Sequence, residues 1–135
     1  MTTDNRIKAS NANLNKLPCV KLLATGGTIA MKADKASGAY VPAVAGDDLL
    51  AAVPDIARFA SVEVSNVFNI PSAHLGPNEW LALHSAVDAA ISDNAVDAVI
   101  ITHGTDTMEE TAYFLSLTVS SGKPIILFGA QRGAS

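Results

Sequence analysis

A continuous run rich in β-branched residues at 97–102 (DAVIIT) is the feature that most constrains the fold of this 135-residue sequence. Its β-branched residues do not alternate with polar ones, which is typical of a strand that is covered on both faces. Strands of this kind belong to parallel sheets, in which helices pack on the faces and connect successive strands. The run therefore predicts an α/β fold.

Three further segments are predicted to be strands of the same sheet. Residues 19–24 (CVKLLA) and 125–128 (IILF) are short apolar runs, and residues 62–68 alternate in part between apolar and polar side chains. Residues 31–46 are small, polar and interrupted by glycine and proline. They are predicted to be a loop, long enough to have a function.

Between the strands, three segments have the pattern of helices. Residues 47–53 begin with two acidic residues, and residues 76–79 (GPNE) open a longer helix that ends near Asn94. In that helix an apolar stripe recurs at spacings of three and four, at Trp80, Leu83, Val87 and Ile91. Thr107 and Glu110 match a capping box at the start of a third helix. The alternation predicts a doubly wound, mostly parallel sheet of the Rossmann or flavodoxin-like type.

Composition excludes several classes of function. Apolar residues make up 49% of the chain and charged residues 16%, which suits a folded domain. The net charge of −4 gives no electrostatic footprint for nucleic acid, and no segment approaches the roughly 20 apolar residues of a membrane span. The single cysteine, Cys19, fits a reducing compartment. We expect a cytoplasmic protein with a flexible tail at residues 1–16 and one domain at residues 17–135.

The sequence places polar residues after three of the predicted strands. Gly26-Gly27-Thr28 follows the first, Ser72 the second, and residues 103–106 (HGTD) the third. In doubly wound sheets, ligands bind beyond the carboxyl ends of the strands. These three segments are therefore the candidate site.

Each of these motifs has a simpler interpretation as well as a functional one. The paired glycines suit a tight turn, and they match neither dinucleotide nor P-loop phosphate patterns. Alternatively, they bring the backbone close to a substrate, with the following threonine as a nucleophile. Residues 103–107 suit a helix-capping loop, and His103 suits a hydrogen-bonded structural histidine as well as acid–base catalysis. No second His or Cys stands at ligand spacing from His103, so no metal site is predicted.

Two motifs resemble a known family. Residues 24–30 (ATGGTIA) and 101–115 (ITHGTDTMEETAYFL) are similar to the two signature segments of the bacterial-type L-asparaginase and glutaminase-asparaginase family. The resemblance extends over residues 17–132. It implies hydrolysis of L-asparagine to L-aspartate and ammonia without a metal or an organic cofactor. L-Glutamine is the alternative substrate, because one methylene is worth only about 1–3 kcal/mol to a pocket.

The resemblance also implies roles for individual residues. Thr28 matches the threonine nucleophile that forms an acyl-enzyme, and Tyr40 matches the tyrosine that assists it from a mobile loop. Thr105 and Asp106 match the family's second threonine and the aspartate that binds the substrate's amino group. The implied catalytic residues are Thr28, Tyr40, Thr105 and Asp106. The implied substrate-binding residues are Gly27, Ser72, Thr105 and Asp106, with Ser72 holding the substrate's α-carboxylate.

The sequence departs from the family in two places. Ala73 replaces a polar residue that is common in the periplasmic enzymes, and the chain ends soon after residues 129–132 (GAQR). Family members are more than twice this length, with a smaller second domain. The resemblance places a lysine that pairs with Thr105 and Asp106, and an acidic residue from a neighbouring subunit, in the part that this sequence lacks. We therefore expect a truncated N-terminal asparaginase domain whose last strand is a bare apolar edge.

Three hypotheses follow from this resemblance. The first is an asparaginase-type amidohydrolase, the second a catalytically silent fragment, and the third a binding remnant that keeps the amino-acid pocket without turnover. Family members are dimers of tight dimers, so the resemblance raises homo-oligomerisation and leaves the oligomeric state of this chain open.

Overall fold

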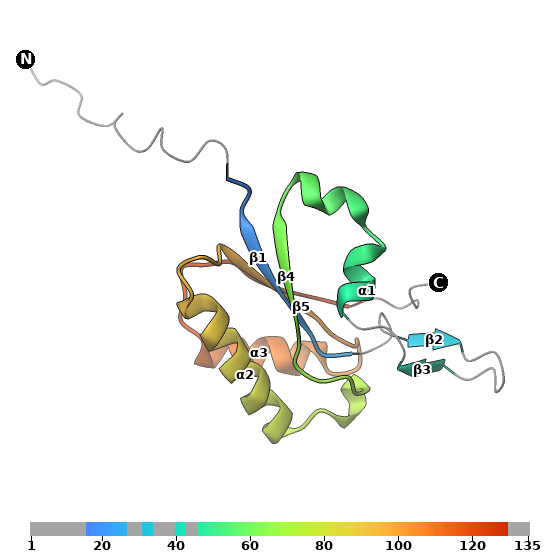
Figure 1. Ribbon diagram of the computed structural model, residues 1–135. Coiled ribbons are helices and arrows are strands. Elements are labelled where there is room, and N and C mark those ends of the chain that lie inside the picture. The colour runs from blue at the N-terminus through green and yellow to red at the C-terminus, as the bar shows by residue number, and fades with distance from the viewer. Residues whose placement is uncertain (1–15, 27–30, 34–39, 43–45, 130–135) are drawn as a thin grey trace, which may run out of the picture.

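The computed structural model describes residues 16–26, 31–33, 40–42 and 46–129. Its centre is a four-stranded, all-parallel sheet in the order β4-β1-β5-β6 (Figure 1). The strands are β1 (Cys19–Ala24), β4 (Ser61–Asn66), β5 (Ala98–Thr102) and β6 (Ile125–Phe128). The predicted α/β class with a parallel sheet is confirmed.

Helices cover the two faces of this sheet unequally. The long helices α2 (Pro77–Ser92) and α3 (Met108–Thr118) lie together on one face, whereas the short α1 (Gly46–Ala51) and the 3-10 helix η2 (Pro54–Arg58) lie on the other (Figure 1). The buried core lies under α2 and α3. Its fully buried side chains are Leu23, Leu83, Val87, Val99 and Ile101.

The predicted stripe of the longer helix is confirmed at its centre. Leu83 and Val87 are fully buried in α2, and Trp80 and Ile91 are partly buried near its two ends. The helix begins as expected, because the Glu79 carboxylate accepts a hydrogen bond of 2.9 Å from the Gly76 backbone N–H.

The predicted capping box at the start of α3 is wrong. Thr107 is the N-cap residue, but its side chain makes no capping hydrogen bond. The Thr107 hydroxyl instead donates to the backbone carbonyl of Ser72, at 2.8 Å. A tertiary acceptor has thus taken the hydroxyl that local sequence would assign to the helix terminus.

The predicted loop at residues 31–46 contains a short hairpin, so this prediction is wrong in part. Strand β2 (Met31–Ala33) pairs antiparallel with β3 (Tyr40–Pro42). Figure 1 shows the hairpin on the side of the sheet where β1 ends. The hairpin therefore lies toward the carboxyl edge of the sheet.

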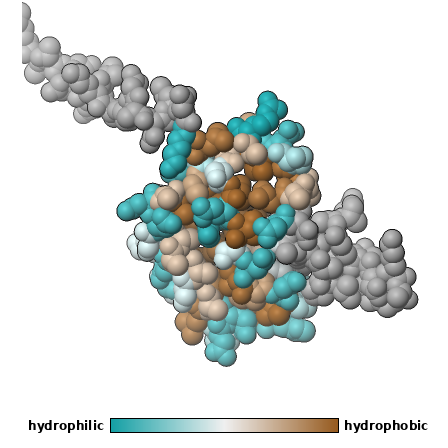
Figure 2. Space-filling model, in the orientation of Figure 1, coloured by the Kyte–Doolittle hydropathy of each residue, from teal (hydrophilic) through white to brown (hydrophobic). Residues whose placement is uncertain are grey.

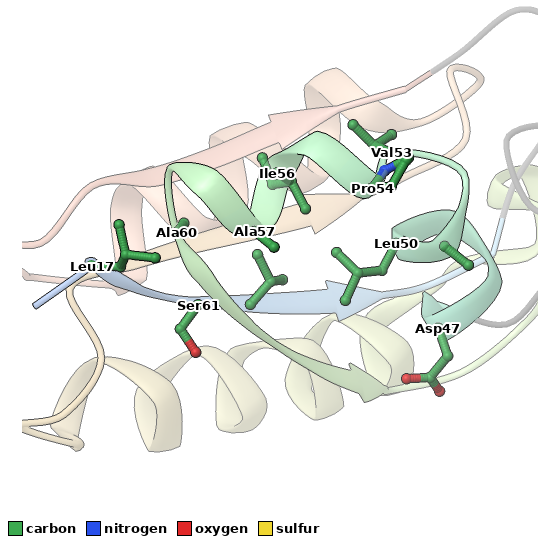
Figure 3. Close-up of a pocket in the computed structure, with 11 residues that line it drawn as sticks. Leu17, Asp47, Leu50, Val53, Pro54, Ile56, Ala57, Ala60 and Ser61 are labelled. Carbon is green, nitrogen blue, oxygen red and sulfur yellow. The ribbon is translucent and has the colours of Figure 1, made fainter.

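The face under α1 and η2 is the less complete one. Figure 2, in the same orientation, shows apolar residues at the surface on this side of the molecule. A hollow of about 590 Å³ lies between the two short helices and the sheet, lined mainly by apolar side chains such as Leu50, Val53 and Ile56 (Figure 3).

Strand β6 forms one edge of the sheet, and two of its apolar side chains reach the surface. Ile126 is 53% exposed and Phe128 is 41% exposed. Among the described residues, the last strand is thus the apolar edge that was expected. No helix in the described ranges is long and apolar enough to cross a membrane.

We expect Cys19 to react slowly with iodoacetamide in the folded chain at neutral pH. Burial, reinforced by the carboxylates of Glu63 and Asp97, raises the pKa of the Cys19 thiol, because each disfavours the thiolate. Alkylation measured by mass spectrometry across a pH series should therefore accelerate at a higher pH in the folded chain than in urea. Coincident profiles for the folded and unfolded chains would contradict the raised pKa.

Candidate active site

The candidate site lies where the topology of the sheet reverses. The chain leaves β1 for β4 on one side and then continues to β5 and β6 on the other. Loops that leave neighbouring strands on opposite sides of such a point diverge, and the crevice between them is the usual ligand site of an open α/β sheet. β1 and β5 are the two central strands, so the segments that follow them border this point.

Thr25 and Gly26 continue β1 into the site. Thr25 is buried, and its hydroxyl and its backbone N–H both donate to the carbonyl oxygen of Thr102, at 2.7 and 3.3 Å. Gly26 has a φ of +93°, a conformation that side chains rarely allow. A Cβ there would also lie 2.8 Å from the Ile70 backbone nitrogen and 2.9 Å from its carbonyl oxygen. Glycine at position 26 is thus required both for its conformation and for space.

Ser72, Asp106 and Thr107 form a hydrogen-bonded node between the segments that follow β4 and β5. Ser72 is buried in the short 3-10 helix η3 (Ser72–His74). Its hydroxyl donates to the Asp106 carboxylate and accepts from the Asp106 backbone N–H, each at 3.3 Å. With the Thr107 bond to the Ser72 carbonyl, three contacts join the two segments.

The structure brings some of the predicted site residues together and leaves others outside its description. Ser72 and Asp106 are in contact, and Thr105 lies exposed beside Asp106 at the same edge. Gly27 and Thr28 lie outside the described residues. Tyr40 begins β3, but its side chain is outside the description as well. The predicted substrate-binding side is therefore described only around Ser72, Thr105 and Asp106.

The Asp106 carboxylate is the charge that this cluster offers to a ligand. Asp106 is exposed, and it stands two residues before the first residue of α3. A negative charge is favourable near the N-terminus of a helix. The exposed Asp106 carboxylate can accept hydrogen bonds from an ammonium group. The hydroxyls of Ser72 and Thr105 beside it can donate to a carboxylate. The described half of the site thus suits a ligand that carries both charges.

His103 is fully buried beneath this edge. Its ring nitrogen Nδ1 lies 2.6 Å from the carbonyl oxygen of Gly104. Because a carbonyl only accepts, Nδ1 must carry a proton in this hydrogen bond. Within the described residues Nε2 has no hydrogen-bond partner. This geometry favours the structural interpretation of His103 over acid–base catalysis.

Thr25 and Gly129 belong to this region, and the sequence patterns did not predict them as site residues. Thr25 joins the ends of β1 and β5, and Gly129 follows β6 directly and packs against the loop after β5. The only sequence signals for them are that Thr25 stands at the end of an apolar run and that Gly129 stands just past a strand. Neither residue type is specific enough at such a place to predict a contact.

Two hollows that the described residues line do not coincide with this cluster. The hollow in Figure 3 lies under α1 and η2, and a second one of about 330 Å³ lies beside it, with Thr102 and Phe128 in its wall. Ser72, Thr105 and Asp106 line neither of them. In the described ranges there is also no group of three or more His, Cys, Asp or Glu residues that could hold a metal ion.

Fold and site together define an α/β protein that gathers hydroxyls and one carboxylate at the switch point of a parallel sheet. The sequence matches the family described as "Asparaginase, N-terminal" over residues 19–135, and the chain belongs to this family. The recognition made from the two signature segments is thereby confirmed.

Individual relatives agree with this assignment. The chain is 45% identical over 118 residues to L-asparaginase 2 of Escherichia coli K12, covering 86% of this chain and 33% of that protein. It is 39% identical over 134 residues to a glutamyl-tRNA(Gln) amidotransferase subunit of Methanococcus vannielii, covering 98% of this chain and 31% of that one.

A solved structure is similar in three dimensions. The crystal structure of a probable cytoplasmic L-asparaginase from Campylobacter jejuni superposes with a TM-score of 0.77 at 40% sequence identity, covering 87% of this chain and 34% of that one. The chain thus spans about one third of the length of the relatives that it matches.

Replacing Thr107 by valine should lower the free energy of unfolding by about 1 kcal/mol, because it removes the bond to the Ser72 carbonyl at nearly constant volume. The Ser72 carbonyl keeps its bond from the Leu75 N–H, so no buried group is left unpaired. Urea denaturation measures the change. Thr107→Ser retains the hydroxyl and is the control, and equal losses in the two variants would contradict this role of the hydroxyl.

Proposed function

We propose that this chain carries the N-terminal part of an L-asparaginase, with Thr28 as the nucleophile that attacks the substrate's amide. The Thr28 oxygen bonds to the side-chain carbonyl carbon of L-asparagine, the C–N bond breaks, and the nitrogen leaves as ammonia with the proton of the hydroxyl. Water then cleaves the resulting ester, which releases L-aspartate and restores the Thr28 hydroxyl. The observation that carries the proposal is the family match over residues 19–135, which includes both signature segments.

The node between Ser72 and Asp106 supports the proposed mode of substrate binding. Asp106 offers an exposed carboxylate to the substrate's α-ammonium group. The single proton of the Ser72 hydroxyl points to Asp106 at 3.3 Å, which is a long hydrogen bond. A substrate carboxylate can compete for that proton at little cost. Ser72 would then turn its donor to the substrate while still accepting from the Asp106 N–H.

Two of the described lysines have partners away from Thr105 and are not the group that would activate it. Lys21 pairs with Glu63 at 3.2 Å, and Lys123 donates to the Asp93 carbonyl at 2.6 Å. A silent fragment and a binding remnant therefore remain the alternatives to an active enzyme. The binding remnant would keep the pocket of the active enzyme without turnover, whereas the silent fragment would aggregate or fold only in part.

A second candidate function comes from the relatives. Several of them are subunits of glutamyl-tRNA(Gln) amidotransferases, at 39–42% identity. An amide-hydrolysing protein of that kind would pass on the nitrogen that it releases instead of discarding it. Preference for L-glutamine over L-asparagine would favour this candidate, and the reverse preference favours the asparaginase.

Compartment and assembly are also proposals. We propose a cytoplasmic location, because the one cysteine, Cys19, is a free buried thiol. We also propose a homo-oligomer, as the family resemblance suggests. The names of the relatives include both a periplasmic and a cytoplasmic asparaginase.

Thr28→Ala should abolish ammonia release from L-asparagine. Loss of a nucleophile removes the covalent route altogether, so we expect a fall in kcat of about 10³-fold or more. A coupled ammonia assay on the purified 135-residue chain measures it, and circular dichroism confirms folding. Thr28→Ser keeps a hydroxyl and is the control. A folded Thr28→Ala variant with undiminished activity would rule out Thr28, whereas a folded but inactive parent chain would favour the binding remnant.

Asp106→Asn should weaken L-aspartate binding by about 10- to 100-fold, because a charge-assisted hydrogen bond to the ligand's ammonium group is worth about 1.5–3 kcal/mol. Isothermal titration calorimetry measures the affinity and does not depend on turnover. Glu109→Gln removes an exposed carboxylate three residues further along the chain and should leave the affinity unchanged. Equal effects of the two variants would point to a general electrostatic attraction instead of a specific contact.

A further inference from the structure

Gly129 directly follows β6 and faces the loop that follows β5. We propose that Gly129 is a positioning residue for Thr105: the absence of a side chain at position 129 sets where the loop of residues 103–106 lies. The catalytic meaning of this role rests on the proposed function, in which Thr105 belongs to the reacting groups.

The first observation is steric. A Cβ added to Gly129 would lie 2.6 Å from the carbonyl oxygen of His103 and 3.1 Å from the Thr105 methyl group. The first of these atoms belongs to the backbone, so the contact cannot be relieved by a change of rotamer. Among the described glycines only Gly26 has a positive φ. Gly129 is thus needed for the space that it leaves and not for an unusual conformation.

The second observation is that His103 cannot easily yield. Its backbone N–H donates to the Phe128 carbonyl at 2.9 Å, which extends the pairing of β5 with β6 by one residue. Its ring is fully buried and bonded to the Gly104 carbonyl at 2.6 Å. The exposed residues of the loop, Thr105 and Asp106, have more room to shift than the buried His103.

Thr105 and Asp106 differ in how firmly they are held. Asp106 has two hydrogen bonds to Ser72, one through its backbone and one through its carboxylate. Thr105 is exposed, and its methyl group would be the side-chain atom nearest to a new Cβ at position 129. A methyl group added at Gly129 should therefore displace Thr105 more than Asp106. In kinetic terms this predicts a lower kcat with a nearly unchanged KM.

Gly129→Ala in the 135-residue chain tests this proposal, with Gly122→Ala as the matched control. A Cβ at Gly122 would meet nothing within 4 Å, so both variants add one methyl group but only one of them adds a clash. We expect the methyl and amide resonances of Thr105 to shift in Gly129→Ala and to stay in place in Gly122→Ala. L-Aspartate affinity should change by less than about threefold, while kcat falls by up to about 100-fold, the loss that follows a displacement of about 1 Å.

Several results would overturn the proposal. One is a folded Gly129→Ala variant whose Thr105 resonances do not move, and another is a loss that falls on KM and leaves kcat intact. If Gly129→Ala does not fold, the unmodified chain decides, since a nuclear Overhauser effect between the Gly129 Hα and the Thr105 methyl group is expected there and its absence would refute the contact. A parent chain that neither binds L-aspartate nor hydrolyses L-asparagine would remove the proposed function and with it the catalytic meaning, while the resonances and the Overhauser effect still decide the positional role.

Discussion

The contact of Thr25 with the carbonyl oxygen of Thr102 is the constraint on which the candidate site depends. Two donors of Thr25, its hydroxyl and its amide, share this one acceptor at 2.7 and 3.3 Å. They join the carboxyl ends of the two central strands, β1 and β5, in a buried environment. Because a buried hydrogen bond is costly to leave unmade, the register of the two strands is fixed at the point where they pass into the site. Gly26 and His103, the residues that follow, are placed by this contact.

Around that contact the shape of the site depends on two glycines, Gly26 and Gly129, as much as on the polar side chains. At Gly26 the backbone of Ile70 approaches to a distance that a Cβ would block, and at Gly129 the loop after β5 does the same. Close packing of backbone against backbone restricts the loops without adding side chains that would fill the crevice. The polar groups that remain at the edge, Ser72, Thr105 and Asp106, are therefore held by their surroundings while some of them stay open to solvent.

The sequence was informative where burial alone decides the structure. Strands Cys19–Ala24 and Ile125–Phe128 were predicted to the residue, because short apolar runs in a parallel sheet have sharp ends. Local patterns failed where a distant group competes. The Thr107 hydroxyl bonds to the Ser72 carbonyl, 35 residues away in the chain, and no local rule contains that acceptor. The hairpin of β2 and β3 was missed because strands of three residues form through pairing and carry too few residues for a pattern.

For the site, topology predicted proximity and the family resemblance supplied the roles. The segments after β4 and β5 were expected at one edge of the sheet, and Ser72 and Asp106 do meet there. The two long hydrogen bonds between them could not be anticipated, because they depend on how η3 sits against the start of α3. The roles of all the site residues stay predictions, and Gly27, Thr28 and the Tyr40 side chain also lie outside the described residues.

Binding and turnover place different demands on this chain. Binding a zwitterionic amino acid needs an anion for the ammonium group and a donor for the carboxylate. In the proposed function Asp106 and Ser72 take these two roles, from segments that are hydrogen-bonded to each other. Turnover also needs a group that removes the proton from a threonine hydroxyl, because the neutral hydroxyl is a weak nucleophile. Lys21 and Lys123 have other partners, Glu63 and the Asp93 carbonyl. Under the proposed function, affinity for L-aspartate and hydrolysis of L-asparagine would therefore be separable, and the first would depend on fewer residues than the second.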